Sequence, residues 1–482
     1  MKLSSLVVVC SISLIAQTSP AGGSGAASGP VRSVSPSATN ATSQYNPLQG
    51  SVASNEKSTT QLSLTLQDAI QRGLRYNLGL LVGDQSTRAA RAEELRARAA
   101  LRPNLSARVG NTYEQVNLAA FGFNFKFPGI NIPSIVGPFN VFDARAYLSQ
   151  TVLDFTALNN RRSATESARA ADFSLRDTRD LVVELVASGY LQVIADQARV
   201  DEAQSEVDTA QVLNQRAQDM KNAGLTPAID ALRAQVELQS EQTRLRGLQN
   251  DRAKDLLVLA RLIGIPLEQT FVLTDTVPFA PLTSVTLETA FDKALKDRSD
   301  YQAAAAQVRA AEASKRAAED ERLPAADINA DYGAIGSAPW SSHGTLTLTG
   351  SVRVSIFDSG RIRADIEQAD AALQQRKAEE ADLRQRIDQQ IRNALLDLQT
   401  AADQVSVARS SVELAHEALT QSQDRFSAGV ADNIEVVQAQ NAVVNAAEQY
   451  ISSVNAHNMA KVALARAIGV ADRGVREYLG GK

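Results

Sequence analysis

One stretch of twelve residues occurs twice in this chain of 482, and the repetition limits the folds that the chain can adopt. The first copy reads DMKNAGLTPAID (219–230) and the second reads DRFSAGVADNIE (424–435). Each contains an Ala-Gly pair, and a carboxylate, Asp230 or Glu435, stands six residues after the glycine. The same turn is therefore used twice.

The similarity extends well beyond this turn. LARLIG (259–264) matches LARAIG (464–469), and TLQDAI (65–70) matches TLETAF (286–291). This is a tandem duplication, because its period is too long for a solenoid repeat. We predict a first unit at 61–270, a second at 271–472 and a tail at 473–482. An insertion in the first unit, 117–140, is expected to be a hairpin's tip loop, with or without extensions of the two strands, that contacts the membrane surface or neighbouring loops, or packs on itself.

Each unit contains a very long helical run. From about Thr156 to Lys221 there is no proline and only one glycine, Gly189. A helix of this length would reach about 100 Å. After the Ala-Gly turn, a return helix leads to Gly264 or Gly469, which are natural left-handed C-caps. Helices this long cannot bury themselves in a globular core, so we expect them to pack as coiled coil. A further helix is predicted over 66–100.

Other segments alternate with a period of two, which is typical of strands. The clearest is TLTLTGSVRVSIF (345–357), with Leu and Val on one face and Thr, Ser and Arg on the other. Four strands are predicted, at about 104–116, 141–153, 325–335 and 344–357. Their polar faces carry six charged residues: Arg108, Glu114, Arg145, Asp327, Asp331 and Arg353.

These strands fit either a small soluble sheet or part of a membrane barrel. Their length suits a tilted crossing of a bilayer, and their charges suit a water-filled lumen better than a buried face. Four strands cannot close a barrel, and an open edge is not tolerated in lipid. Three chains would supply twelve strands. The pattern therefore favours a barrel shared between chains.

The N-terminal residues 1–21 resemble a secretory signal peptide. Lys2 precedes an apolar run from Leu6 to Ala16, which is shorter than the roughly 20 residues of a membrane-spanning helix. Cleavage after Ala16 or Ala21 would remove Cys10, the only cysteine. A lipoprotein reading of Cys10 stays open, although little apolar sequence precedes it. Residues 22–60 are rich in Ser, Gly and Ala and are predicted to be a disordered tether. No later apolar run has the length expected of a transmembrane helix.

Enzymatic function is not indicated. The three histidines, His343, His416 and His457, lack partners at metal-ligand spacing, so we expect solvated side chains and no metal or other cofactor. There is no Gly-rich phosphate loop and no nucleophile elbow. The net charge of −5 gives no reason to expect a nucleic-acid partner.

Taken together, the signal peptide, the two helix–strand–strand–long helix–turn–helix units and the paired turns resemble the TolC-like outer membrane efflux proteins. The specific matches are Pro103 and Pro324, AGLTPAIDALRAQ (223–235) and AGVADNIEVVQAQ (428–440), and the two Ile-Gly stops. The resemblance implies a homotrimer with a twelve-stranded outer-membrane barrel continuous with a twelve-helix periplasmic tunnel. It also implies a passive exit duct that docks on a periplasmic adaptor protein and an inner-membrane pump.

On this resemblance, the Ala-Gly turns would form the periplasmic tip. The adaptor would dock on Asn222, Ala223, Gly224, Leu225, Thr226, Ser427, Ala428, Gly429, Val430 and Ala431. Asp230 and Glu435 would form an acidic ring at the constriction, which would favour cations. Alternatively, each carboxylate only offsets the dipole of its return helix, which contributes roughly 0.3–1 kcal/mol. The family's usual latch residues are missing, which leaves Arg425 and Asp432 as candidates.

A rival hypothesis is a periplasmic coiled-coil scaffold without a conducting pore. The alternating strands and the duplicated architecture argue against it. Within the duct hypothesis, export of drugs, metals or secreted protein all stay open, because the pump selects the cargo.

Overall fold

The computed structural model describes residues 46–53, 61–122, 133–224, 226–276, 279–282, 286–428, 430–431, 433–472, 474 and 479. The chain divides into two units, Met1–Tyr45 and Asn46–Lys482, and every described residue belongs to the second. The predicted signal peptide and most of the predicted tether lie outside the described residues.

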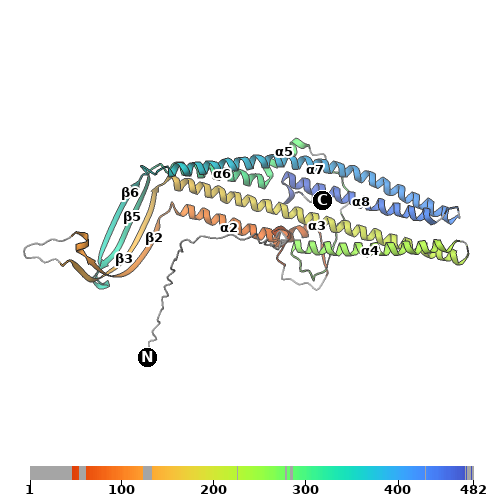
Figure 1. Cartoon of the computed structure of the whole chain (residues 1–482), viewed down its shortest axis with the longest axis horizontal. Helices are drawn as coiled ribbons and strands as arrows, with labels where there is room; N and C mark the ends of the chain where they lie inside the picture. Colours follow the sequence, from red (N-terminus) through yellow and green to blue (C-terminus); the bar gives the residue numbers. More distant parts are fainter. Residues whose placement is uncertain are drawn as a thin grey trace, which may run out of the picture. The chain divides into compact units, whose positions relative to one another are not determined.

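The helices form two series of matching length (Figure 1). The first series has 11, 22, 68 and 36 residues and the second has 11, 22, 67 and 36. In the first unit they are α1 (Leu66–Tyr76), α2 (Leu78–Ala99), α3 (Phe155–Asn222) and α4 (Ala228–Ile263). In the second unit they are α5 (Leu287–Asp297), α6 (Ser299–Asp320), α7 (Arg361–Ser427) and α8 (Asn433–Ile468). The nearly equal lengths follow from the repeat seen in the sequence.

One antiparallel sheet contains the four predicted strands in the order β2-β3-β5-β6. Their bounds are β2 (Asn104–Asn117), β3 (Ile135–Leu153), β5 (Ala325–Gly336) and β6 (His343–Arg353). β3 begins inside the insertion, as the alternative with strand extensions allowed, and β6 ends at Arg353 rather than at residue 357. Short 3-10 turns, η2 (Leu118–Phe121) and η3 (Pro339–Ser341), lie next to the strand ends. β2 and β6 are the sheet's two edges.

A second sheet, which the sequence did not predict, has two parallel strands, β1 (Leu62–Leu64) and β4 (Phe271–Leu273). It covers the middle of α3, where Tyr190 is fully buried and its hydroxyl donates to the carbonyl of Leu64 at 3.1 Å. The largest hydrophobic cluster gathers here, with residues from β1, α1, α3, α4, β4 and α8. This packing fixes where the two repeats meet.

The helix predicted over 66–100 is broken at Asn77, which ends α1 and caps α2. Its side chain accepts from the amide of Gly79 at 2.8 Å and donates to the carbonyl of Leu48 at 2.7 Å. Leu48 lies in η1 (Pro47–Gln49), a short turn beside α2. The prediction of a disordered tether therefore does not hold for 46–53, because these residues pack on the helices.

His457, expected to be solvated, is only 1% exposed. Its ring lies 4.7 Å from that of Phe279, between centroids. Burial lowers the pKa of this imidazole, and the nearby Lys461 lowers it further. The surface interpretation is therefore wrong for His457.

Among the described helices, α3 alone has an 18-residue window apolar enough to cross a membrane, with a mean hydropathy of 1.2. Half of that window is buried within the protein. Val182, Val183 and Val186 of α3 belong to the main hydrophobic cluster. The apolar character of α3 is thus accounted for by packing against its neighbours.

Candidate pore-lining and tip sites

The strand register places all six predicted lumen residues on one face of the sheet. Arg108 pairs with Arg145, Glu114 lies opposite Phe139, and Asp331 lies opposite Tyr147. Asp327 lies opposite Ser351, and Arg353, two residues further along β6, shares its face. The two-residue period was sufficient to predict this common face.

Ion pairs cross the strands on this polar face. The guanidinium of Arg145 contacts Asp143 at 2.5 Å and Asp331 at 3.0 Å. Arg353 lies 3.6 Å from Asp327, which also accepts from the hydroxyl of Ser351 at 3.0 Å. Asp143 was not among the predicted residues, although it stands two positions before Arg145 and therefore faces the same way. The polar face is thus an interlinked charged surface.

The opposite face of the sheet is apolar and open. Its side chains are not covered by any part of the chain that the structure describes. Leu105, Val109, Tyr113, Tyr332, Leu346, Leu348 and Val352 are each between 67% and 74% exposed. An apolar surface of this kind is stable only against lipid or a partner.

The two tips are built alike. The backbone amide of Ala223 donates to the backbone carbonyl of Asp219 at 2.9 Å, and that of Ala428 donates to the backbone carbonyl of Asp424 at 3.0 Å. Both long helices therefore end in the same way. Gly224 has φ +73°, and a Cβ there would meet nothing within 4 Å. Asn222, Ser427 and Val430 are exposed, and Thr226 and Ala431 are partly exposed. Leu225, Gly429 and the candidate latch residue Asp432 lie outside the described residues.

The two predicted constriction carboxylates have different surroundings. Asp230 is 8% exposed and lies 3.3 Å from Arg233, one helical turn later. Glu435 is more exposed and lies 3.2 Å from Arg425, so this candidate latch residue links α7 to α8. Each carboxylate lies in the first turn of its return helix, where the dipole interpretation requires it.

A groove of about 350 Å³ separates α4 from α8 next to these carboxylates. Ile229, Leu232 and Val236 line one side, and Ile434 and Val437 line the other. The tip thus combines charge at the start of each return helix with an apolar surface between them. No group of three or more His, Cys, Asp or Glu side chains is placed to hold a metal ion within the described ranges.

Comparisons with known proteins agree with this architecture. The chain matches the family described as outer membrane efflux protein over 69–265 and again over 290–470. It is 25% identical to the pyoverdine export outer membrane protein OpmQ of Pseudomonas aeruginosa, over 84% of this chain and 85% of that protein. It is 23% identical to the probable efflux pump outer membrane protein TtgC of Pseudomonas putida, over 88% of this chain and 87% of that protein.

Solved structures of low sequence identity share the fold. The Campylobacter jejuni CmeC outer membrane channel superposes with a TM-score of 0.73 at 15% identity, covering 90% of this chain and 95% of that one. The outer membrane protein VceC of Vibrio cholerae superposes with a TM-score of 0.72 at 17% identity, covering 84% of this chain and 96% of that one. With both repeats matched by the family, this chain belongs to the outer membrane efflux proteins of the TolC type and resides in the outer membrane, with its helices extending into the periplasm.

Proposed function

We propose that three copies of this chain form the outer-membrane exit duct of a tripartite export system. The duct passively conducts small molecules or secreted protein that an inner-membrane pump delivers. The relatives named for pyoverdine export and for efflux pumps support this assignment. The observation that carries it is the four-stranded sheet with one charged face and one open apolar face.

The sheet is incomplete in a single chain. Its apolar face suits lipid, its ion-paired face suits water, and its edge strands β2 and β6 expose backbone groups that lipid cannot satisfy. Joining β6 of one copy to β2 of the next removes both edges. Three copies then give a twelve-stranded barrel, with Arg108, Glu114, Arg145, Asp327, Asp331 and Arg353 in its lumen.

The other end of each long helix is proposed to meet the rest of the machine. The exposed backbone at Gly224 and the equivalent turn at 427–431 allow a helical hairpin of the adaptor protein to approach closely. In the trimer, the three copies of Asp230 and the three copies of Glu435 then place six carboxylates around one opening. The buried setting of Asp230 supports its helix-end role, and the exposure of Glu435 supports a place in the ring.

The test uses the full-length protein expressed with its own signal. We expect it in the outer-membrane fraction as a trimer that falls apart on heating in detergent, and we expect it to conduct ions in planar bilayers. A soluble monomer, or a trimer without conductance, would instead support the coiled-coil scaffold.

The cargo is tested separately by deleting the gene. Increased susceptibility to drugs with an unchanged set of secreted proteins indicates small-molecule efflux, whereas loss of one secreted protein indicates type I secretion. If neither changes, the duct has no export role under those conditions and the proposal fails.

A further inference from the structure

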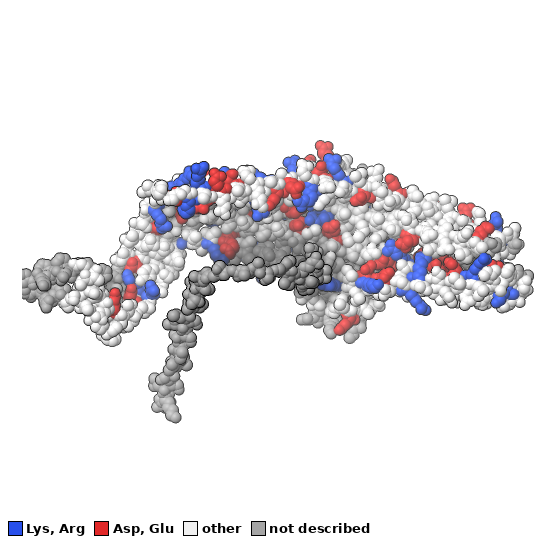
Figure 2. All heavy atoms as spheres, in the orientation of Figure 1, with Lys and Arg blue, Asp and Glu red and all other residues white. Residues whose placement is uncertain are grey.

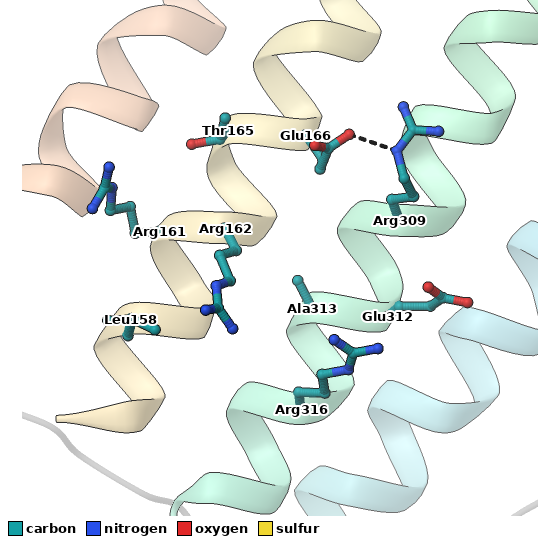
Figure 3. A pocket seen from close by; sticks show the side chains of 9 residues that line it. All are labelled: Leu158, Arg161, Arg162, Thr165, Glu166, Arg309, Glu312, Ala313 and Arg316. Atoms are coloured by element: carbon teal, nitrogen blue, oxygen red, sulfur yellow. Dashed lines mark hydrogen bonds and ion pairs between the residues drawn. The ribbon is translucent and has the colours of Figure 1, made fainter.

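A basic pocket lies between α3 and α6 (Figure 3), near the start of α3 and the end of α6, which adjoin strands β3 and β5. It encloses about 480 Å³ and is lined by nine residues: Leu158, Arg161, Arg162, Thr165, Glu166, Arg309, Glu312, Ala313 and Arg316. Four of these are arginines and two are glutamates. Arg162 reaches into the space between the two helices, where Ala313 occupies little room (Figure 3).

Most of this positive charge is not neutralised by the protein. Glu166 is engaged by Arg309 at 2.8 Å and by Arg169, and Glu312 lies 3.7 Å from Lys377, outside the pocket. Within the described ranges, the only acceptor that Arg162 reaches is the neutral amide oxygen of Asn159, at 2.9 Å.

Arg161 and Arg316 have no ionic partner among the residues that the structure describes. Three guanidinium groups of the pocket therefore lack a carboxylate partner in the described part of the chain. Such a set fits an anion, and arginines bind phosphate oxygens in a bidentate manner.

In the proposed duct, the pocket would lie at the depth of lipid headgroups. α3 begins at Phe155, directly after β3 ends at Leu153, so Arg161 and Arg162 lie about 9–11 Å along the helix from its start. The headgroup layer adds roughly 5–8 Å to each side of the hydrocarbon core, and arginine side chains extend several ångströms towards it.

An exposed apolar collar marks the boundary above the pocket. It consists of Leu153, Phe155, Leu323, Ile356 and Phe357, which are between 39% and 95% exposed. Basic side chains gather at this end of the helices, next to the strands (Figure 2). A ring of apolar and aromatic groups followed by basic ones is typical of a membrane interface.

The pocket opens on the outer side of the proposed duct. Multiples of seven residues separate Arg162, Val183 and Tyr190. In a coiled coil, residues at this spacing lie on one face of the helix. Val183 and Tyr190 belong to the cluster beneath the β1–β4 sheet. Three such sheets inside the trimer would fill the lumen, so the sheets and this face of α3 lie on the outside of the duct. At the level of the pocket, the same face meets lipid.

We propose that this pocket binds the phosphate of an anionic phospholipid in the leaflet that faces the periplasm. The headgroup phosphate lies between Arg162 and Arg316, with Arg161 and Arg309 at the rim, and the acyl chains run along the collar and the apolar face of the sheet. This inference rests on the proposed trimeric duct, because the trimer sets which side of α3 meets the membrane.

Native mass spectrometry of purified trimers provides the test. Trimers released from nanodiscs of mixed phosphatidylglycerol and phosphatidylcholine should retain phosphatidylglycerol, up to one per subunit. R162Q/R316Q should weaken retention about tenfold or more, since charge-assisted hydrogen bonds to phosphate are lost. R162K/R316K, which keeps the charge but not the bidentate geometry, should retain an intermediate amount.

R216Q/R246Q is the matched control, because it removes two exposed arginines of α3 and α4 outside the pocket. It should retain lipid like the unmodified protein. Equal retention of phosphatidylcholine, equal loss in the control, or equal competition by inorganic phosphate and by phosphatidylglycerol would each overturn the lipid site. Conducting trimers that retain no lipid refute only this inference, whereas a failure to form trimers refutes the proposed function.

Discussion

At the scale of single residues, the two tip carboxylates show how similar sequence can have different surroundings. Asp230 and Glu435 occupy equivalent positions, yet Asp230 is buried beside Arg233 and Glu435 pairs with Arg425 across two helices. The repeat predicts the position of each carboxylate. It does not predict the partner, because the partner depends on neighbouring side chains that differ between the copies.

We expect D230N/E435Q to abolish the cation preference of the trimer. Six carboxylates would be lost from one opening, while side-chain size is kept. The reversal potential in a potassium chloride gradient across a planar bilayer should move towards zero. Glu288→Gln is the control, because Glu288 also lies in the first turn of a helix, α5, but not at the tip. An unchanged reversal potential in the double variant would leave only the helix-dipole role.

Gly264 gives a second prediction at this scale. Its φ is +71°, and a Cβ there would lie 2.5 Å from the Cβ of Tyr76. Gly264→Ala should therefore destabilise the protein by about 1–3 kcal/mol, and by more if Tyr76 cannot move. Gly247, inside α4, has open space around it, so Gly247→Ala should stabilise by about 0.5–1 kcal/mol. Apparent melting temperatures measured side by side should shift in opposite directions. An unchanged or raised melting temperature for Gly264→Ala would contradict the C-cap role.

At the scale of elements, local periodicity predicts what local physics determines. The period-two strands and the proline-free helices were visible because each depends on residues nearby in sequence. The break at Asn77 was not visible, because it depends on the carbonyl of Leu48, which is distant in sequence. The burial of His457 was missed for the same reason, since it depends on Phe279.

The coiled coil of α3 and α4 holds a buried carboxylate that should make its stability depend on pH. Burial, helped by the neighbouring Glu202, Glu241 and Glu237 and opposed by Arg244, raises the pKa of Glu206 from 4.5 to about 7. The folded state therefore holds the proton of the Glu206 carboxyl more tightly than the unfolded chain does. The resulting stability is fully present below about pH 4.5 and is lost as the pH rises through about 7.

Glu206→Gln mimics the protonated form, so the variant should match the unmodified protein below about pH 4.5 and be more stable than it above about pH 7. Hydrogen exchange of α3 and α4 amides, or apparent melting temperature, would measure the difference. Glu413→Gln on an exposed face of α7 serves as the control and should show no such pH-dependent gain in stability. A pH-independent difference for Glu206→Gln would assign its effect to packing.

At the scale of the whole molecule, the sheet and the helices impose one assembly requirement. Each chain presents two open strand edges and an uncovered apolar face, which no rearrangement within the four strands removes. The neighbouring strands of the sheet are all antiparallel, and their number is even. In the proposed trimer, a closing pair between β6 and β2 of the next copy would therefore also be antiparallel, so the ring would close without a change of pattern.

Cysteine pairs across this closing contact test it directly. Val109→Cys in β2 would be combined in turn with cysteine at Leu346, Leu348 or Val352 in β6, all on the same exposed face. Paired strands bring opposite Cα atoms to about 4.5–5.5 Å, within disulfide range, so we expect at least one combination to give covalent trimers on oxidation. As the control, A146C/Y332C joins directly opposed residues of β3 and β5 in one chain and should leave the monomer mass unchanged. Cross-linked species of more than three subunits would indicate an open assembly. The absence of any cross-link would contradict closure through β2 and β6, the two strands of this sheet with an unpaired side.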